Sequence, residues 1–533
     1  MRGGCGEGER RFLEEDAGGR MDRVGLMGAI GSWRGGEGEA GLRRMSTIES
    51  VGLGAVVERA MAYRTFAGLP ALAGLGSMHE AVRPGLAVAE SVRRLKRHHY
   101  VLRRLHALWV GRITSEPVYE VKMAFSLHAH LAAEHVTALR ARVGEMREPP
   151  LGLEDVPHAG LEVLMDEVLA SAGTGELLMG VYEVVLPALR DAMERHRGEA
   201  HVLADQPTRR ALRLVALELE EMLDWGRAAV SALVTEGERG AWAPARAVLE
   251  AAMRSAGGMD GTMGEAGPVP ARLRSATPWR YDGVPRRDAR FEDPYNMGVN
   301  AEVFLYDPGM PSDAKVLMMY YKRLREIDVP EMMASILAET PGKPWGYYRD
   351  MTRQLWDEAR HAMLGEVGFV AAGVDWPREV RVNFTWSLGL NTQLKPMERH
   401  AVLYFIEQGL MPRTGKRHEW EVSLAAANPL ASTIQDFDWA DEVLHARIGR
   451  DWYVSAMPSA HEAVQYGDRC WSRVLMGWAE WRAQGLTAHE NWWPSLYAGW
   501  CAREGREPDA RAASYAVTYE TVRADLRDVS ASG

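Results

Sequence analysis

The sequence predicts an all-α protein. Long segments rich in Ala, Leu, Glu and Arg recur along the 533 residues, and no run alternates polar with apolar residues. Tryptophan (18) and methionine (27) are abundant, whereas phenylalanine (9) is scarce. Alanine and unbranched side chains favour helices, and alternation with a period of two is typical of half-buried strands. A chain of this length exceeds what one hydrophobic core accommodates, so we expect several domains.

The composition excludes several classes of protein. A hydrophobic fraction of 47% is too high for a wholly disordered chain, and a net charge of −10 argues against general binding of nucleic acids. Cys5, Cys470 and Cys501 are too few for a disulfide framework or a cysteine-built zinc site, which favours a cytoplasmic location. No apolar run approaches the roughly 20 residues of a membrane span, so no membrane association is expected.

The N-terminal half predicts one helical bundle. Residues 1–47 are rich in Gly, Arg and Glu without an apolar period and are expected to be a disordered extension, with Met21 or Met45 as alternative starts. Residues 48–235 are expected to form the bundle. Residues 236–296 are rich in Gly and Pro and are expected to be a linker that contains one short helix. The four long helices of the bundle are centred on Ser91–Trp109, Val118–Val143, Gly175–Arg197 and Thr208–Val234.

The C-terminal half predicts a second bundle over residues 297–457. Pro330 lies inside its first helix and predicts a kink or a break there. Residues 458–533 form a Trp-rich extension with two or three further helices, whose tryptophans are expected in the core or in a contact within a homodimer. The four expected helices of the second bundle are Asp313–Thr340, Trp345–Ala372, Pro396–Leu410 and Ala431–Ser455.

Two Glu-x-x-His patterns carry the chemistry. Glu358 and His361 lie in the second of these helices, and Glu442 and His445 lie in the fourth. Three residues along a helix place both side chains on one face, where a carboxylate and an imidazole can bind the same metal ion. The bare pattern is weak, since about one or two matches are expected by chance and such a pair is usually a solvated helix face. Both patterns lie deep in apolar helical segments, which favours a metal site.

An aspartate precedes each glutamate. Metal-bound imidazole usually donates its second N–H to a carboxylate. Across an antiparallel bundle Asp357 is placed to reach His445, and Asp441 is placed to reach His361. We therefore expect each aspartate to accept a hydrogen bond from a ligand histidine and so to orient its ring, without binding the metal itself.

Two more carboxylates are expected on the helices before each pattern. Glu407 precedes Glu442 by 35 residues, and Glu326 precedes Glu358 by 32, the separation that a helix, a turn and an antiparallel return place side by side. Glu331 is a rival of Glu326, which we prefer.

The complete set resembles the ligand pattern of the ferritin-like di-iron carboxylate superfamily. The strings Asp-Glu-Ala-Arg-His (357–361) and Asp-Glu-Val-Leu-His-Ala-Arg (441–447) also resemble an uncharacterised bacterial family within it. The resemblance covers about residues 313–455 and implies a ferritin-like four-helix bundle. It also implies two iron ions, with manganese or a mixed pair as alternatives, held by Glu326, Glu358, His361, Glu407, Glu442 and His445.

The resemblance implies an oxidoreductase or oxygenase that uses dioxygen or peroxide. Its substrate would be a small molecule of unknown identity, and an electron-donor protein is a candidate partner. Two alternatives stay open. One is a metal-free or metal-storing helical scaffold that binds a protein partner. The other is an RNA-modifying hydroxylase, which would need the basic run between Arg93 and Arg104 beside the metal pocket, although a solvated helix face explains that run better.

The N-terminal half resembles a degenerate copy of the same bundle. Glu134 aligns with Glu358, but Thr137 replaces His361; Glu183 and Glu218 keep the 35-residue spacing, but Glu221 replaces His445. We therefore expect tandem ferritin-like bundles of which only the second binds metal. His128, His130, Glu134 and His135 form a dense cluster, which polar residues on a helix surface explain at least as well as a separate metal site.

Overall fold

The structure is a computed structural model that describes residues 54–147 and 151–519, apart from the side chains of 476–479. Every regular element in these ranges is a helix, and the one β pairing within them is a single bridge between Val299 and Thr518. The all-α prediction is confirmed for this part of the chain. The N-terminal extension predicted for residues 1–47 lies outside it. None of the helices described is long and apolar enough to cross a membrane.

The chain divides into two compact units, Met1–Val82 and Arg83–Gly533. The first unit contains short helical elements, and its last helix begins with a capping box in which Ser77 and Glu80 each bond the other's backbone N–H. The second unit contains all the predicted site residues. The first unit contains a helical stretch over residues 54–62, followed by η1 (Phe66–Gly68), η2 (Ala71–Gly74) and α2 (Met78–Ala81).

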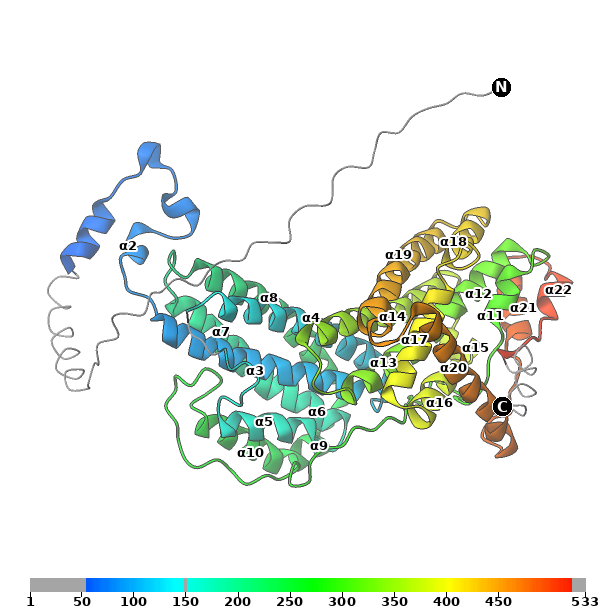
Figure 1. The fold of residues 1–533 in the computed structure, drawn as a ribbon, viewed down its shortest axis with the longest axis horizontal. Helices are drawn as coiled ribbons and strands as arrows, with labels where there is room; N and C mark the ends of the chain where they lie inside the picture. The colour runs from blue at the N-terminus through cyan, green and yellow to red at the C-terminus, as the bar shows by residue number, and fades with distance from the viewer. Residues whose placement is uncertain (1–53, 148–150, 520–533) are drawn as a thin grey trace. The chain divides into compact units, whose positions relative to one another are not determined.

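The second unit begins with a group of long helices at the four predicted places (Figure 1). Helix α3 packs along α4, and α8 packs on both α7 and α4. Apolar side chains such as Leu105, Trp109 and Phe125 are fully buried between them. The members of this group are α3 (Val88–Ile113), α4 (Tyr119–Gly144), the continuous α6 (Thr174–Met179), η3 (Gly180–Val185) and α7 (Leu186–Glu199), and α8 (Gln206–Leu233).

The segment expected to be a linker, residues 236–296, is held against this first group. It contains α9 (Glu236–Ala241) and α10 (Ala243–Ser255), and α10 packs on α5 (Ala159–Leu169), a helix that was not predicted. Arg97 of α3 donates hydrogen bonds to three backbone carbonyls of the segment, those of residues 256, 258 and 259. The basic run of α3 is therefore only in part a solvated face, because Arg94, Arg97, His98 and His99 are buried whereas Arg93 is exposed.

The second group of helices differs from the prediction in two respects, a break in its first helix and the presence of additional helices. The first predicted helix is divided at Glu326 and Ile327 into α12 and α13, while Pro330 falls in the first turn of α13, where a missing N–H costs little. Helices α11, α15, α16 and α18 were not predicted. The elements up to α19 are α11 (Ala301–Tyr306), α12 (Ser312–Arg325), α13 (Asp328–Ala338), α14 (Trp345–Ala371), α15 (Trp376–Glu379), α16 (Thr385–Gln393), α17 (Pro396–Gly409), α18 (Lys416–Ala425) and α19 (Pro429–Trp452).

Helix α14 is the centre of this group. It packs on α12, α13 and α19 and, on another side, on α4 of the first group, while α17 packs on α19 and α13 (Figure 1). The Trp-rich extension covers the group with α20 (Ala460–Ala483), which packs on α17, and with α21 (Trp493–Arg503) and α22 (Ala510–Ala513). Trp471, Trp493 and Trp500 are buried in the core.

Candidate metal centre

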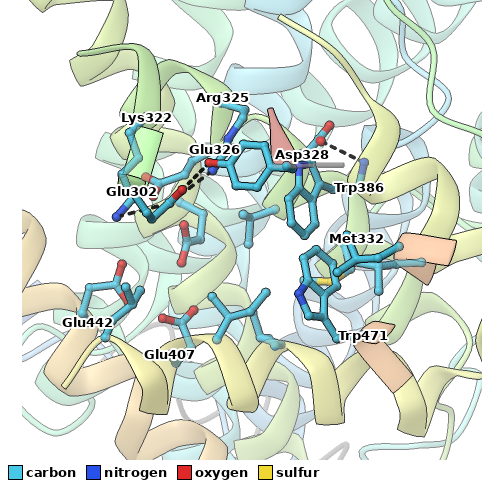
Figure 2. Close-up of a pocket in the computed structure, with 18 of the residues that line it drawn as sticks. Glu302, Lys322, Arg325, Glu326, Asp328, Met332, Trp386, Glu407, Glu442 and Trp471 are labelled. Atoms are coloured by element: carbon cyan, nitrogen blue, oxygen red, sulfur yellow. Dashed lines mark hydrogen bonds and ion pairs between the residues drawn. The ribbon is translucent and has the colours of Figure 1, made fainter. Parts of the chain in front are cut away.

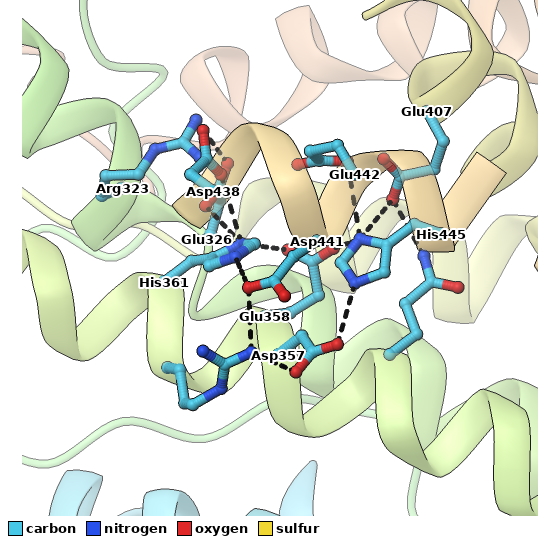
Figure 3. A network of polar contacts seen from close by, with 12 residues as sticks. Arg323, Glu326, Asp357, Glu358, His361, Glu407, Asp438, Asp441, Glu442 and His445 are labelled. Atoms are coloured by element: carbon cyan, nitrogen blue, oxygen red, sulfur yellow. Dashed lines mark hydrogen bonds and ion pairs between the residues drawn. The ribbon is translucent and has the colours of Figure 1, made fainter. Parts of the chain in front are cut away.

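The six predicted ligand side chains lie together between α14, α17, α19 and the break that follows α12 (Figure 3). Ligand atoms of Glu358, Glu407, Glu442 and His445 all lie within 4.8 Å of one another, and all four residues are buried. A second group with the same spacing consists of Glu326, Glu358 and His361. Glu358 belongs to both groups, so its carboxylate is within reach of both sets of ligand atoms.

Both histidines direct one ring nitrogen at the carboxylates. Nδ1 of His445 lies 3.1 Å from Glu358 and 3.4 Å from Glu442. Nδ1 of His361 lies 3.5 Å from Glu326 and 3.6 Å from Glu358. The two ring centroids are 5.9 Å apart. The patterns on α14 and α19 thus face each other.

The other ring nitrogen of each histidine contacts the aspartate of the opposite helix. His361 Nε2 lies 3.1 Å from Asp441 Oδ2, and His445 Nε2 lies 3.3 Å from Asp357 Oδ2 (Figure 3). Because each aspartate can accept the Nε2 proton, Nδ1 is the nitrogen that faces the glutamates and is available to a metal ion once it is deprotonated. The reciprocal arrangement is the one expected from the spacing of Asp357 and Asp441.

Four buried atoms of this cluster have no hydrogen-bond partner among the residues that the structure describes. They are Nδ1 of His361 and of His445, and one carboxylate oxygen each of Glu326 and Glu442. Buried polar atoms are nearly always satisfied in folded proteins, so a group of orphans that face one another calls for a missing partner. Imidazole nitrogen and carboxylate oxygen are suitable ligands for iron, manganese or zinc. The residues present therefore fit two transition-metal ions.

A glycine lies one helical turn after each histidine. Because it has no side chain, a neighbouring helix can pack closely against α14 or α19 at this point. A Cβ added at Gly365 would lie 2.2 Å from the backbone nitrogen of Leu324, and one added at Gly449 would lie 2.5 Å from the ring of Tyr404. These contacts bring α12, whose end carries Glu326, against α14, and bring α17, which carries Glu407, against α19. The extended pattern Glu-x-x-His-x-x-x-Gly occurs on both helices. It is a signal that could have been found in the sequence.

Buried cations also contact the carboxylates. Lys416 Nζ, from the unpredicted helix α18, lies 2.8 Å from Glu442 and 2.9 Å from Asp438. Arg323 is fully buried, pairs with Asp438 and lies 2.9 Å from Glu326. Asp438 itself lies 3.5 Å from His361 Nδ1 and is an additional candidate ligand.

Four residues of the cluster were not predicted from the sequence, namely Asp438, Gln354, Lys416 and Arg323. Asp438 lies four residues before Glu442, and Gln354 lies four residues before Glu358 and donates a hydrogen bond of 2.9 Å to Glu407. Their helical spacing was a usable signal. Lys416 and Arg323 gave no such signal, because their segments carry many charges and only the packing of α12 and α18 selects these two.

The electrostatics of the cluster reflect crowded charges. Burial disfavours the imidazolium of His361, but its contacts with Asp441, Glu326 and Glu358 prevail and raise its pKa to about 10. Burial raises the pKa of Glu407 well above its usual range, and the neighbouring Glu442 carboxylate adds to the shift. Burial disfavours the charged form of Glu326, but the positive charges of Arg323 and Lys416 outweigh this effect and lower its pKa to about 2. Metal binding at His361 must therefore displace a proton.

A cavity of about 340 Å³ opens beside the cluster (Figure 2). All four predicted glutamates line it. Glu326, Glu407 and Glu442 lie on one side, and Met332, Trp386 and Trp471 lie on the opposite side. The volume lies at the small end of the range for ligand pockets. A small, largely apolar molecule in this cavity would lie next to the carboxylates.

Glu331, the rival of Glu326, lies elsewhere. It pairs with Lys122 and lies 2.9 Å from Arg287, in a buried ion cluster between the two helix groups. It contributes no atom to the groups of candidate metal ligands.

The corresponding residues of the N-terminal half have other partners. Glu134 pairs with Arg349, Glu183 pairs with Arg239, and Glu218 pairs with His135. Thr137 Oγ1 accepts a hydrogen bond from the indole of Trp345. The dense cluster around His128 does not converge, because His128 bonds the Tyr182 hydroxyl instead. In the described residues of this half, no three candidate ligands gather as they do in the C-terminal half.

Comparison with protein-family models, with curated proteins and with solved structures gives no match for this chain.

Proposed function

We propose that the chain is a di-metal carboxylate oxidoreductase of the ferritin-like superfamily. The observation that carries the proposal is the reciprocal pairing of two buried Glu-x-x-His helices, in which each histidine contacts the aspartate of the other helix at 3.1 and 3.3 Å. Each feature of that pairing has a defined task in metal binding and none is needed for a merely packed core.

Different residues of the chain would bind the metal ions, orient their ligands and hold the substrate. The four glutamates and two histidines would hold two ions, iron with manganese as the alternative, and Asp357 and Asp441 would orient the rings. When bound, such ions supply the capacity to reduce dioxygen or peroxide, because six ligands leave coordination positions open. The apolar side of the cavity would exclude water and position the substrate. Electrons would come from a separate donor protein.

The proposal includes tandem ferritin-like bundles, of which the first has lost its ligands. Its support is the arrangement of four mutually packed helices in each group and the replacement of His361 by Thr137 at the aligned position. A cytoplasmic location accords with the free thiols of Cys470 and Cys501.

One observation favours a metal-free scaffold as the second candidate. Lys416 and Arg323 are buried cations that already offset the charge of Glu442, Glu326 and Asp438. A cluster neutralised by its own side chains can persist without ions. The RNA-modifying alternative gains no such support, because the residues that line the cavity in the described part of the chain do not include any from α3.

Elemental analysis of the full chain, purified without added metal and again after anaerobic loading with ferrous iron, tests the proposal. About two transition-metal ions per chain are expected. His361→Ala should abolish activity and weaken metal binding, whereas Thr137→Ala, the matched control in the N-terminal group, should change neither. Absence of bound metal after loading would favour the scaffold.

A further inference from the structure

A second cavity lies between the two groups of helices. It has a volume of about 780 Å³, with α3 and α4 on one side and the end of α13 and the start of α14 on the other. Helix α13 packs on α3, and α14 packs on α4, so the second cavity belongs to the contact between the groups. Its volume is typical of ligand pockets, which occur preferentially at contacts of this kind.

Basic side chains outnumber acidic ones among the described residues that line the second cavity. The acid is Glu154, and the bases are Arg103, Arg104, Arg140 and Lys343. This excess of positive charge contrasts with the net charge of −10 of the whole chain. A cavity lined by one sign of charge raises the local concentration of ligands of the opposite sign. The second cavity therefore favours an anion.

The carboxylates beside these arginines do not balance their charge. Arg103 and Arg140 both pair with Glu154, whose side chain is 65% exposed. Arg104 pairs with Asp166, which a further arginine also contacts. The side chains of Arg103 and Arg140 are 26% and 27% exposed, so part of each is accessible. One exposed carboxylate for two guanidinium groups leaves positive charge that a second anion would offset.

Aromatic side chains also line the second cavity. They are Trp279, Trp345 and Tyr348, and each is half-buried. The ring centroids of Trp345 and Tyr348 are 6.0 Å apart, and the indole N–H of Trp345 donates a hydrogen bond to Thr137 that holds the ring in place. Planar rings stack on tryptophan and tyrosine side chains largely irrespective of their identity. The second cavity thus combines surfaces for a planar ring with donors for an anion.

We propose that the second cavity binds a nucleotide, in which a phosphate is joined through a sugar to a planar ring. The phosphate accepts hydrogen bonds from Arg103 and Arg140, and the ring stacks on the aromatic side chains. Phosphate fits the two arginines because guanidinium groups donate paired, charge-assisted hydrogen bonds to its oxygens. A purine nucleotide and a flavin nucleotide share this chemistry. Binding of this kind needs no metal ion, so its test is independent of the proposed function.

Calorimetric titration of the full chain with two matched pairs of probes tests the assignment. The pairs are adenosine monophosphate with adenosine, and flavin mononucleotide with riboflavin, and the members of each differ only in the phosphate. We expect at least one nucleotide to bind about tenfold or more tightly than its unphosphorylated partner, because the charge-assisted hydrogen bonds are lost without the phosphate. The nucleotide that binds more tightly identifies the ring.

Inorganic phosphate is the third probe and should bind more weakly than that nucleotide, because it has no ring to stack. Equal affinities within both pairs, absence of binding by both nucleotides, or inorganic phosphate that binds as tightly as the nucleotide would each overturn the proposal.

Substitutions at the phosphate position change affinity in opposite directions. Arg103→Gln and Arg140→Gln should each weaken nucleotide binding about tenfold, and Glu154→Gln should strengthen it, because the carboxylate that competes for both arginines is removed. Arg190→Gln is the matched control, since this arginine of α7 is 30% exposed and pairs with Glu220 outside the second cavity. It should bind the nucleotide as wild type does.

Adenosine or riboflavin should bind equally well to wild type and to all four variants. Unchanged nucleotide affinity in both arginine variants, or weaker binding in Glu154→Gln, would refute the phosphate site. If the arginine variants do not fold, Glu154→Gln decides the matter, because it changes an exposed side chain.

Discussion

At the residue scale, the contact between Asp441 and His361 is the most direct test of the outer support of the metal centre. Asp441→Ala removes the acceptor at 3.1 Å from Nε2, so the ring loses its fixed orientation. We expect metal affinity or turnover to fall about 10–100-fold with the fold intact, and Asp441→Asn to do less damage. Asp436→Ala changes an exposed aspartate of the same helix and serves as control. Affinity equal to wild type in Asp441→Ala would discard this role.

Lys416 distinguishes a metal centre from a metal-free charge cluster. Lys416→Met leaves Glu442 and Asp438 without this partner, and breaking a buried ion pair typically costs about 3–5 kcal/mol. We expect that loss of unfolding free energy in chelator, and a clearly smaller loss with bound ferrous or manganous ions, because the ions supply the missing positive charge. Urea unfolding of variant and wild type under both conditions measures it. Equal losses would indicate that no ion binds near Lys416.

At the element scale, the centre depends on how closely α12 approaches α14. Gly365→Ala places a Cβ 2.2 Å from the backbone of Leu324, which cannot move aside as a flexible side chain can. We expect a loss of about 1–3 kcal/mol in unfolding free energy, the usual cost of overpacking, together with weaker metal binding because Glu326 is displaced.

Gly198→Ala in α7 is the control for Gly365→Ala, since an added Cβ there meets nothing within 4 Å. It should be neutral or stabilising by up to about 1 kcal/mol through helix propensity. Urea unfolding and metal titration of both variants check the pair. Normal stability of Gly365→Ala would show that α12 and α14 lie further apart than described.

At the scale of the whole molecule, buried neutral histidines predict instability in mild acid. Burial lowers the pKa of His106 to about 4 and that of His128 to about 3, far below the ordinary value near 6.5. Between pH 4 and 6.5 the unfolded chain therefore binds more protons than the folded chain, so stability falls as the pH falls through this window. The pKa of each of His98, His99, His196 and His400 is also lowered by burial.

Urea unfolding at pH 7 and pH 5, in chelator, checks this effect. The free energy of unfolding should drop from pH 7 to pH 5, and His106→Gln should reduce that drop by up to about 2 kcal/mol. His461→Gln changes an exposed histidine and should leave the drop unchanged. A drop of the same size in His106→Gln would show that His106 does not remain neutral in the fold.

Much of the fold follows from local patterns in the sequence. The bounds of α14, α17 and α19 were predicted to within a few residues, because apolar periodicity and the flanking Pro and Gly act over one or two turns. The break at Glu326 was placed too late, at Pro330, because proline is tolerated in the first turn of a helix and the actual break has no local marker.

By itself, the sequence determined which residues share a helix face. The spacing of Glu358 with His361, and of Glu442 with His445, follows from the helical repeat and needs no tertiary information. The placement of Asp357 and Asp441 toward the opposite helix followed from the same repeat.

Tertiary structure alone decided which distant groups meet. It separated Glu326 from Glu331 and brought Lys416 to Glu442. The repeat of a helix sets directions only within that helix, whereas these contacts depend on the distances between helices. Those distances are set by the side chains at each crossing, down to the missing Cβ of Gly365 and of Gly449.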